Sequence, residues 1–515
     1  MEEWHPRPGD RIVRPHRQRH YHLRRVLGIP ALFSAGYGNV GSSIYYALGV
    51  VALTALGATP IVLAIAGIIY IFNALTYAEG GAMLPEAGGS SSFARHGFND
   101  LVGFIAGWAL MLSYTVTMCI SAYTIPPYLS HFFPVMNEQV VGTAVSMGII
   151  LFLMVINVVG IRESAGLNIG FITVDIITQV TLVVLGIVLI LLPKPADLFQ
   201  HMFGAGNWPS TQNLIFGIAI AALCFTGVET VAQLSEETRQ PEKRVPRTYV
   251  LMIVAVLVLF AGISIVALSA MTPQELGDPI NGWARDPVAG IAHSITRVIA
   301  PEKLASEVSS NTEIIIILSW IFRGVRDVLP GLVAILAASI LLIATNAGLI
   351  GISRLAFNLS THHQLPAGLS RVHKRFRTPY ITIILFCLIA IAGLIPGFFT
   401  AQFFADLGAL YVFGSLLTFA LAHASILSLR VKRPDLLRPF IPIGNITIKG
   451  QTLSVTAILG LIATSTIWVV IVVTQPYSRW NGLAWMAVGL VIYVIYRRVR
   501  RIPLVHLKND PDHTK

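Results

Sequence analysis

The sequence predicts an all-α polytopic membrane protein with 12 transmembrane helices, and three observations lead to this fold class. Hydrophobic residues make up 55% of the 515 residues and charged residues only 12%, which is too little polar surface for a soluble chain of this length. Apolar segments of about 20 residues or more recur, and each is long enough to cross a bilayer as a helix. Lysine and arginine are concentrated in every second connection between these segments.

The predicted spans follow one another from residue 28 to residue 496. They lie at 28–56, 59–78, 100–125, 139–160, 167–192, 213–235, 248–270, 330–352, 379–397, 405–428, 453–474 and 481–496. A signal peptide is the competing interpretation of the first span, because a basic stretch precedes it. Its apolar run continues to about Leu56, so we expect a retained span. The segment 313–323 is short and charged at its edges, and we expect an amphipathic helix there, within a long outer loop at 271–329.

The positive charges predict the orientation of the chain. With both termini inside, 29 of the 36 Lys and Arg residues fall on the inner side and 7 on the outer side. We therefore expect a basic cytoplasmic tail at 1–27, a second one at 497–515, and a multi-pass protein of the plasma membrane. The net charge of +11 belongs to this membrane face, which argues against nucleic acid as a partner.

The cysteines and glycines give no sign of a metal or nucleotide site. Cys119, Cys224 and Cys387 all lie in apolar runs, without the spacing of a disulfide framework or of metal ligands. A glycine-rich phosphate cradle needs a preceding strand, and none is expected here. We therefore expect neither a metal nor a cofactor.

Two predicted spans are interrupted near the middle of the membrane. The first contains "GYGNVGSS" at 36–43, and the sixth contains "CFTGVE" at 224–229. Each opens a set of five spans, at 28–192 and at 213–428, and an odd number of spans forces the second set to insert upside down. Paired interrupted helices in corresponding positions indicate a transporter with inverted repeats, followed here by two extra helices at 453–496.

An interrupted helix exposes main-chain groups that lipid cannot satisfy, so the break must line a cavity in the protein. The N-terminus of a half-helix offers N–H groups to a carboxylate, and its carbonyl end suits an ammonium group or a cation. A pair of such breaks therefore suits both ends of an amino acid zwitterion. The alternative is that the small residues only allow close packing of helices.

An ordered series of motifs resembles the amino acid–polyamine–organocation superfamily of secondary transporters. These motifs are "GSSI" at 41–44, "YAEGGAMLPEAGGS" at 77–90, "GFIAGW" at 103–108, "GIRESAGLN" at 160–168, "FTGVETVAQLSEETRQPEKRVPR" at 225–247, "SRLAFNLSTHHQLP" at 353–366 and "LRVKRPDLLRPF" at 429–440. The resemblance covers nearly all of the chain from Pro30 to Pro442. It implies a leucine-transporter-type fold of five plus five inverted helices that carries amino acids by alternating access.

The resemblance also implies the residues of the substrate site. The main-chain N–H groups offered to the substrate carboxylate would come from Gly41, Ser42 and Ser43. The carbonyls offered to its amino group would come from Cys224, Phe225 and Thr226, with Gly227 giving the break its flexibility. Two departures weaken the case for a cationic or polyamine cargo, because Leu223 replaces a gating aromatic residue and Ser113 an acid of some relatives.

Ionisable side chains inside the spans are costly in lipid and are therefore candidates for coupling to H⁺ or Na⁺. Asp175 lies about ten residues into the fifth span, near the midplane at roughly 1.5 Å per residue, where several proton-coupled relatives carry a lysine. We expect it to bind an ion, and the alternative is a structural carboxylate held by Thr173 or Thr178. Glu229 follows the second break, where it would relay a proton or hold the unwound segment. Hydroxyls beside Asp175 are expected from Ser339 and Thr345.

Four further residues are expected to control access or packing. Tyr45 and Glu79 are assigned to gating, and Glu79 and Glu86 should pair with arginines of the inner face. His423 in the tenth span is expected to be a satisfied packing residue, and proton transfer is the alternative.

The sequence thus predicts a secondary active importer of amino acids rather than an enzyme. The alternative within the same fold is a transporter of potassium or another inorganic cation. Further alternatives are an amino acid sensor and a membrane enzyme, for which the adjacent His362 and His363 form a poor ligand pair. The partners are then an amino acid, H⁺ or Na⁺ and the bilayer, with a homodimer through the last two spans.

Overall fold

The computed structural model describes residues 25–160, 165–279, 281–298, 312–376, 378–400, 402–448 and 451–505. Most of the tail predicted at 1–27 and half of the one at 497–515 lie outside these ranges. The described chain is helical apart from loops and one two-stranded sheet, so the predicted all-α class is confirmed.

The helices of the first half end at the break in the sixth predicted span. They are α1 (Ile29–Gly41), α2 (Ile44–Ala55), α3 (Thr59–Met83), α4 (Ser90–Gly97), α5 (Asp100–Leu129), α6 (Gln139–Val159), α7 (Ala165–Gly186), α8 (Pro195–Phe203), α9 (Thr211–Ala221) and α10 (Glu229–Gln233). Short 3₁₀ or π segments accompany them: η1 (Leu56–Ala58), η2 (Pro134–Asn137), η3 (Ile187–Leu191), η4 (Ala222–Phe225) and η5 (Ser235–Glu237).

The second half contains longer helices and the sheet. Its helices are α11 (Pro241–Ala270), α12 (Pro273–Gly277), α13 (Pro287–Val298), α15 (Thr312–Thr361), α16 (Tyr380–Leu394), the 3₁₀ segment η6 (Ile395–Phe398), α17 (Phe403–Lys432), α18 (Val455–Thr474) and α19 (Pro476–Val499). The strands β1 (Asn445–Ile448) and β2 (Gln451–Ser454) form an antiparallel hairpin between α17 and α18. The segment 313–323 is not a separate loop helix as predicted, because it continues without interruption into α15.

Within the described ranges, eleven segments are long and apolar enough to cross a membrane. One of them, Ile29–Met83, has 55 residues, whereas a single crossing needs about 20. It contains α1, α2 and α3, and the turn η1 separates the last two, where Leu56 adopts a positive φ of 46°. The predicted first and second spans both fall within this segment.

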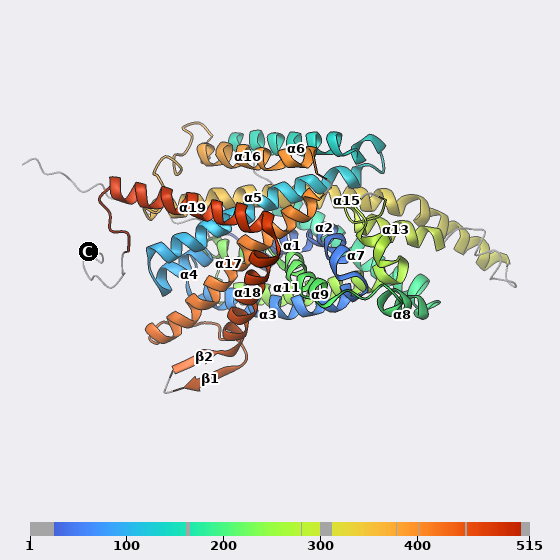
Figure 1. Ribbon diagram of the computed structural model, residues 1–515, viewed down its shortest axis with the longest axis horizontal. Helices are drawn as coiled ribbons and strands as arrows, with labels where there is room; N and C mark the ends of the chain where they lie inside the picture. Colours follow the sequence, from blue (N-terminus) through green and yellow to red (C-terminus); the bar gives the residue numbers. More distant parts are fainter. Residues whose placement is uncertain are drawn as a thin grey trace, which may run out of the picture.

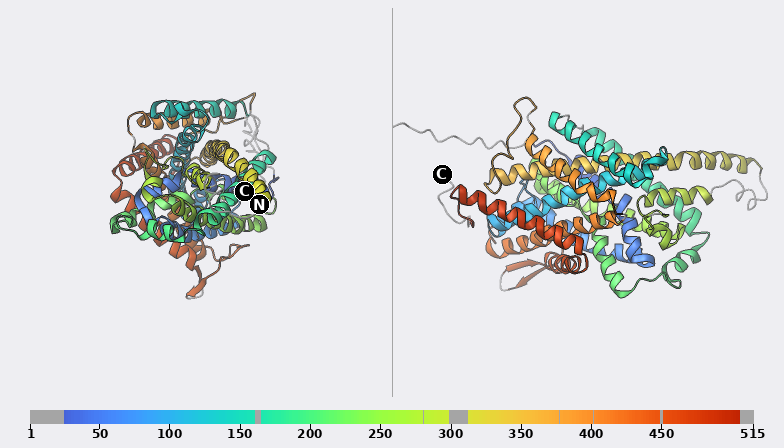
Figure 2. Two further views of the ribbon diagram at one scale, coloured as in Figure 1. Left: turned by 90° about the vertical axis from the view of Figure 1, so that its right-hand side faces the viewer. Right: turned by 45° about the horizontal axis from the view of Figure 1, so that its top comes forward.

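A buried central helix and an apolar periphery organise the bundle. In α5, 83% of the most apolar 18-residue stretch is buried inside the protein. This helix packs against α15 and α17 (Figure 1). In contrast, only 22–39% of the corresponding stretch is buried in α6, α16, α18 and α19. The helices α6 and α16 lie side by side on the outside of the bundle (Figure 2). Their exposed side chains, such as Phe152 and Val491, are apolar, which fits a lipid solvent.

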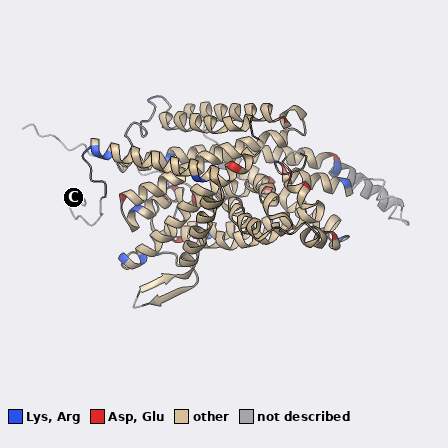
Figure 3. Cartoon of the chain, viewed as in Figure 1, with Lys and Arg blue, Asp and Glu red and all other residues tan. Residues whose placement is uncertain are grey.

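The two ends of the bundle differ in charge. At one end α17 finishes with Arg430 and Lys432, and α19 finishes with Arg497 and Arg498, so we call it the basic end (Figure 3). The helices α8, α12 and α13 lie at the other end, which we call the loop end (Figure 1). The described part of the connection predicted at 271–329 contains α12, α13 and the first turns of α15.

A buried histidine joins three of the helices near the basic end. The ring nitrogens of His423 on α17 lie 2.8 Å from Thr76 Oγ1 and 2.8 Å from Asn73 Oδ1, both on α3. On its other side the ring packs directly against Gly460 of α18, where a Cβ atom would lie 2.2 Å from His423 Cε1. The geometry is that of a satisfied packing residue.

We expect Gly460→Leu to destabilise the protein by roughly 2 kcal/mol, because the held imidazole leaves no room for a side chain between α17 and α18. Thermal unfolding of the purified protein in detergent would measure the change. The matched control is Gly148→Leu, since a Cβ atom at Gly148 on the peripheral α6 would meet nothing within 4 Å. Equal melting temperatures for the two variants would contradict this account of the packing.

Candidate functional site

The break in the sixth predicted span is a true interruption of the helix. After α9 and η4, Thr226 is extended with ψ 159° and Gly227 adopts φ 99°, before α10 begins at Glu229. A residue with a Cβ atom is strained at this φ, and the atom would also lie 2.8 Å from Asn39 Cγ. The sequence therefore places glycine where the backbone must turn against the first span.

The break in the first span is milder than the sequence indicates. α1 ends at Gly41 and α2 begins at Ile44, but Ser42 and Ser43 keep helical angles. The Ser43 N–H donates to Val40 O at 3.1 Å and the Tyr46 N–H to Ser43 O at 3.2 Å, which is the i to i−3 pattern of a 3₁₀ turn. The interruption at 36–43 is thus a tightened turn of two residues rather than an extended stretch.

The two interruptions meet in the buried interior. Ser43 Oγ lies 2.5 Å from Cys224 O and 2.5 Å from Val40 O, so its single proton is shared between two carbonyls. Asn39 Nδ2 donates to Thr230 Oγ1 at 2.8 Å, one turn beyond the break. Ser43 of the first span and Cys224 of the sixth are therefore brought together, and the carbonyl of Cys224 accepts a hydrogen bond from the protein.

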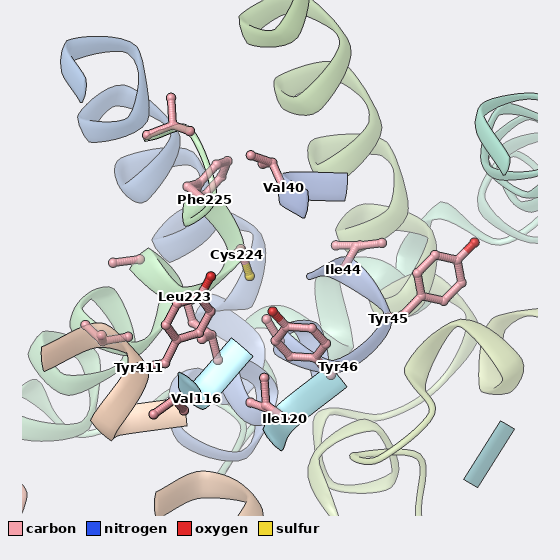
Figure 4. Packing of buried hydrophobic residues seen from close by; sticks show 14 of the residues in the cluster. Val40, Ile44, Tyr45, Tyr46, Val116, Ile120, Leu223, Cys224, Phe225 and Tyr411 are labelled. Atoms are coloured by element: carbon pink, nitrogen blue, oxygen red, sulfur yellow. The ribbon is translucent and has the colours of Figure 1, made fainter. Parts of the chain in front are cut away.

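Apolar side chains surround this meeting point. Figure 4 shows Leu223, Tyr46 and Tyr411 gathered beside Cys224, with Val116 and Ile120 of α5 next to them. All of these residues are buried. Since their contacts are mostly apolar, the surroundings suit an aliphatic side chain better than a charged one.

Tyr45 points away from this cluster and contacts Asp175 instead (Figure 4). Asp175 on α7 is buried, and its Oδ1 accepts from Tyr45 Oη at 2.5 Å, while its Oδ2 accepts from Gln179 Nε2 at 2.7 Å. The same hydroxyl network continues from Tyr37 to Gln179 Oε1 at 3.4 Å and from Tyr128 to Tyr45 O at 2.7 Å. Both carboxylate oxygens of Asp175 therefore carry a donor.

The hydroxyls that the sequence suggested as neighbours of Asp175 make other hydrogen bonds. Each donates to a carbonyl of its own helix: Thr173 to Ile169, Thr178 to Val174, Ser339 to Ile335 and Thr345 to Leu341, at 2.7–2.9 Å. The Asp175 carboxylate is thus hydrogen-bonded by Tyr45 and Gln179 rather than by Thr173 or Thr178. Tyr37, Tyr128 and Gln179 lacked any motif that would have singled them out.

Glu229 is the second buried acid beside the break. Its Oε2 accepts the Gly227 N–H at 3.2 Å, and its Oε1 has no hydrogen-bond partner within the described ranges. Its carboxylate interacts electrostatically with four buried tyrosines, Tyr77, Tyr114, Tyr249 and Tyr411. The amide oxygen of Asn39, which lies beside Gly227, likewise lacks a partner among the described residues. Glu229 thus has one carboxylate oxygen without a hydrogen bond in the described part of the chain, next to the break.

Ion pairs close the basic end. Glu79 on α3 binds the buried Arg430 of α17 through two parallel hydrogen bonds, Nε to Oε1 at 2.8 Å and Nη2 to Oε2 at 2.7 Å. Glu86 pairs with Arg95 at 2.5 Å and with His96 at 2.8 Å, as predicted for an inner-face acid. Burial raises the pKa of Glu86, but the hydrogen bond from His96 and the charge of Arg95 outweigh it and leave this pKa well below its usual value.

Further contacts at the basic end join the start of α1 to the segment after the second break. The N–H groups of Val26 and Leu27 donate to Glu237 O at 2.8 and 3.0 Å, and Arg354 of α15 binds the Glu237 carboxylate at 3.0 Å. The sequence contains no pattern that would have indicated the Arg354–Glu237 pair, whose members lie far apart along the chain.

A cavity of about 680 Å³ opens at the loop end. The ends of α5 and α11, the start of α17 and the segment from α12 to α13 line it, with Tyr123, Met271, Trp283, Asp286 and Phe404 among the lining residues. Burial raises the pKa of Asp286 to about 7, and the charge of Arg285 opposes this shift. Open space thus lies at the end of the bundle opposite the ion pairs.

Comparison with known proteins places this geometry in context. The model of the family described as amino acid permease matches residues 27–495. A branched-chain amino acid permease of Bacillus subtilis is 25% identical over 92% of this chain and 94% of its own length. A methylthioribose transporter of the same organism is 26% identical (92% and 94%), and a low-affinity putrescine importer of Escherichia coli is 24% identical (94% and 96%). All three relatives are membrane transporters by name.

We expect Glu79→Gln to lower the free energy of unfolding by about 3 kcal/mol, because Arg430 would remain buried without an anion. Denaturation of the purified protein would measure the loss. Asp435→Asn is the control, since Asp435 and Arg433 form an exposed pair at 3.6 Å whose removal should cost less than about 1 kcal/mol. A Glu79→Gln protein as stable as the control would show that the buried pair contributes little.

Proposed function

Because the chain belongs to the amino acid permease family, we propose that it is a secondary active transporter of amino acids that works by alternating access. The contact between the two interrupted spans, Ser43 with the Cys224 carbonyl, is the observation that carries this proposal. It places polar main chain from both predicted repeats at one buried point, where a small zwitterion can be bound by backbone groups alone. The proposed topology has twelve crossings, two of them within Ile29–Met83, with both termini cytoplasmic.

The proposed substrate site includes Gly41, Ser42, Ser43 and the residues 224–227. The Ser43 hydroxyl donates to the Cys224 carbonyl, whose second lone pair is the one proposed for the substrate ammonium group. The apolar surroundings formed by Leu223, Val116 and Ile120 favour an amino acid with an aliphatic side chain. The named activity of the Bacillus subtilis branched-chain permease supports the same choice.

The basic end and the loop end suggest the state of the proposed transport cycle. Ion pairs of Glu79, Glu86 and Glu237 close the basic end, which the positive charges assign to the cytoplasm. The cavity at the loop end then faces outward. We therefore assign to Glu79 the inner-gate role, whereas Tyr45, also expected to gate, acts by holding Asp175.

For coupling to H⁺ or Na⁺, the two buried acids are not equivalent. Asp175 accepts a hydrogen bond on each of its oxygens, which leaves it fewer free lone pairs for a cation. Glu229 has one oxygen without a partner in the described structure. We propose that Glu229 takes up the coupling ion and that Asp175 holds α2 against α7.

The buried Glu229 oxygen without a partner in the described structure also favours one second candidate, transport of an inorganic cation. Uptake measurements in reconstituted vesicles would separate the two functions. An amino acid transporter accumulates labelled amino acid, whereas a cation transporter moves rubidium or sodium without any amino acid present. Stabilisation of the purified protein by one of the twenty amino acids, tested with and without sodium, would identify the cargo.

We expect Ser43→Leu to abolish substrate binding while the protein remains inserted and folded, because the larger side chain fills the meeting point of the two breaks. Binding is measured by the thermal shift with the stabilising amino acid, and folding by circular dichroism. Thr181→Leu is the matched control, since Thr181 is exposed on α7 and bonds its own helix at Ile177. Retained binding in Ser43→Leu would remove the proposed site.

Glu229→Gln and Asp175→Asn test the assignment of the coupling residue. We expect Glu229→Gln to lose gradient-driven accumulation but to keep exchange of substrate across the membrane, because the amide cannot take up a proton and binds Na⁺ more weakly. Asp175→Asn should keep accumulation and lower the melting temperature. The reverse pattern in vesicles would assign coupling to Asp175.

A further inference from the structure

The connection between α17 and α18 is a β-hairpin with two chemically different faces. Asn445 pairs with Ser454, Ile446 with Leu453, and Thr447 with Thr452. Successive side chains of a strand point to opposite faces, so the first and third pairs share one face and the second pair lies on the other. One face of the hairpin is therefore polar. The other face carries Ile446 and Leu453, with Gln451 at the end near the turn.

The polar side of the hairpin is attached to the buried ion pair at the basic end. Arg430 Nη1 donates to Asn445 Oδ1 at 2.7 Å and to Thr452 O at 3.3 Å, while the rest of the same guanidinium binds Glu79. These bonds fix which face of the hairpin is directed toward the protein. In this hairpin the polar face is directed toward the protein. In a sheet on the surface of a water-soluble protein, the apolar face would be directed inward.

Three isoleucines of this segment are exposed, and Leu453 beside them is partly buried. We call Ile441, Ile443, Ile446 and Leu453 the apolar patch, and its three isoleucines are 55%, 88% and 50% exposed. An isolated two-stranded hairpin is marginal in water, and exposed isoleucine adds to its cost. Figure 1 shows the hairpin projecting beyond the helices, next to the start of α18.

The position of the hairpin indicates lipid as its partner. It begins shortly after α17 ends at Lys432 and leads directly into α18 at Val455, so both of its ends lie where membrane helices end. The peripheral helix α18 continues the uncovered surface with Leu459 and Ile462, which are 45% and 59% exposed. Lys432 stands at the same boundary, where it donates to Gly97 O at 3.1 Å and adds a positive charge that suits anionic headgroups.

We propose that the apolar patch of the hairpin inserts into the bilayer interface at the basic end of the bundle. The apolar face of the hairpin then contacts lipid, and its polar face contacts the Arg430–Glu79 pair. Each face therefore meets groups of its own polarity. This inference concerns the membrane contact of the protein and is independent of which solute it carries.

Fluorescent labelling of single introduced cysteines tests the proposal. The native Cys119, Cys224 and Cys387 are buried, so a thiol-reactive environment-sensitive dye should react with Ile446→Cys in the otherwise unchanged chain. Thr447→Cys is the matched control, because it is the next residue on the same strand but lies on the other face. Both proteins are reconstituted into vesicles of phosphatidylglycerol and phosphatidylethanolamine, with and without nitroxide-bearing acyl chains.

We expect the dye at 446 to emit at shorter wavelength than the dye at 447, to be quenched by the nitroxide lipid, and to be shielded from aqueous iodide. Equal quenching at the two positions would overturn the proposal. Shielding at 446 that depends on the ratio of protein to lipid, and not on the nitroxide, would also overturn it, because a second copy of the chain would then cover the patch.

Ile443→Cys provides a second position if Ile446→Cys fails to fold. Ile443 precedes β1, so its replacement leaves the strand pairing intact, and its high exposure makes it reactive. Quenching by the nitroxide lipid is expected here as well. A dye at 443 that responds to iodide as strongly as the dye at 447 would overturn the proposal.

Discussion

Main-chain N–H and C=O groups inside a bilayer must find hydrogen-bond partners within the protein, and this constraint determines the structure at the centre of the molecule. The interrupted spans satisfy it jointly, since Ser43 reaches the Cys224 carbonyl, Asn39 reaches Thr230, and Glu229 accepts the Gly227 N–H. Each break is thus stabilised by the other, although 181 residues separate Ser43 from Cys224. The contact explains why small and polar residues occupy positions at which a simple anchor would carry leucine.

Charged side chains at the ends of the bundle also need partners when they are buried. At the basic end the acids Glu79, Glu86 and Glu237 each have an arginine partner, and Glu79 is paired where water does not reach. At the loop end, Arg285 and Asp286 are among the residues that line an open cavity. Ion pairs at one end and a cavity at the other give the molecule a closed end and an open end.

The features that could be predicted from sequence are those set by local composition. Apolar runs located the spans, the glycine at 227 marked the second break, and Glu86 and Glu79 near a basic face indicated ion pairs. The polar contacts of Asp175 could not be found in this way, because Tyr45 lies 130 residues away and no motif joins the two. The first break was overestimated, since glycine and serine permit an unwound backbone without requiring one, and Ser42 and Ser43 keep helical angles.

The unequal depth of the two breaks has a mechanical consequence. The 3₁₀ turn at Ser42 and Ser43 keeps the hydrogen-bond ladder nearly intact, so α1 and α2 behave as one stiff rod with a slight overwinding. At Thr226 and Gly227 the ladder is absent, and twisting one half of the sixth span there strains few bonds. A rotation of one half of the first span therefore turns the other half with it. In the sixth span, the two halves can rotate separately about residues 226 and 227.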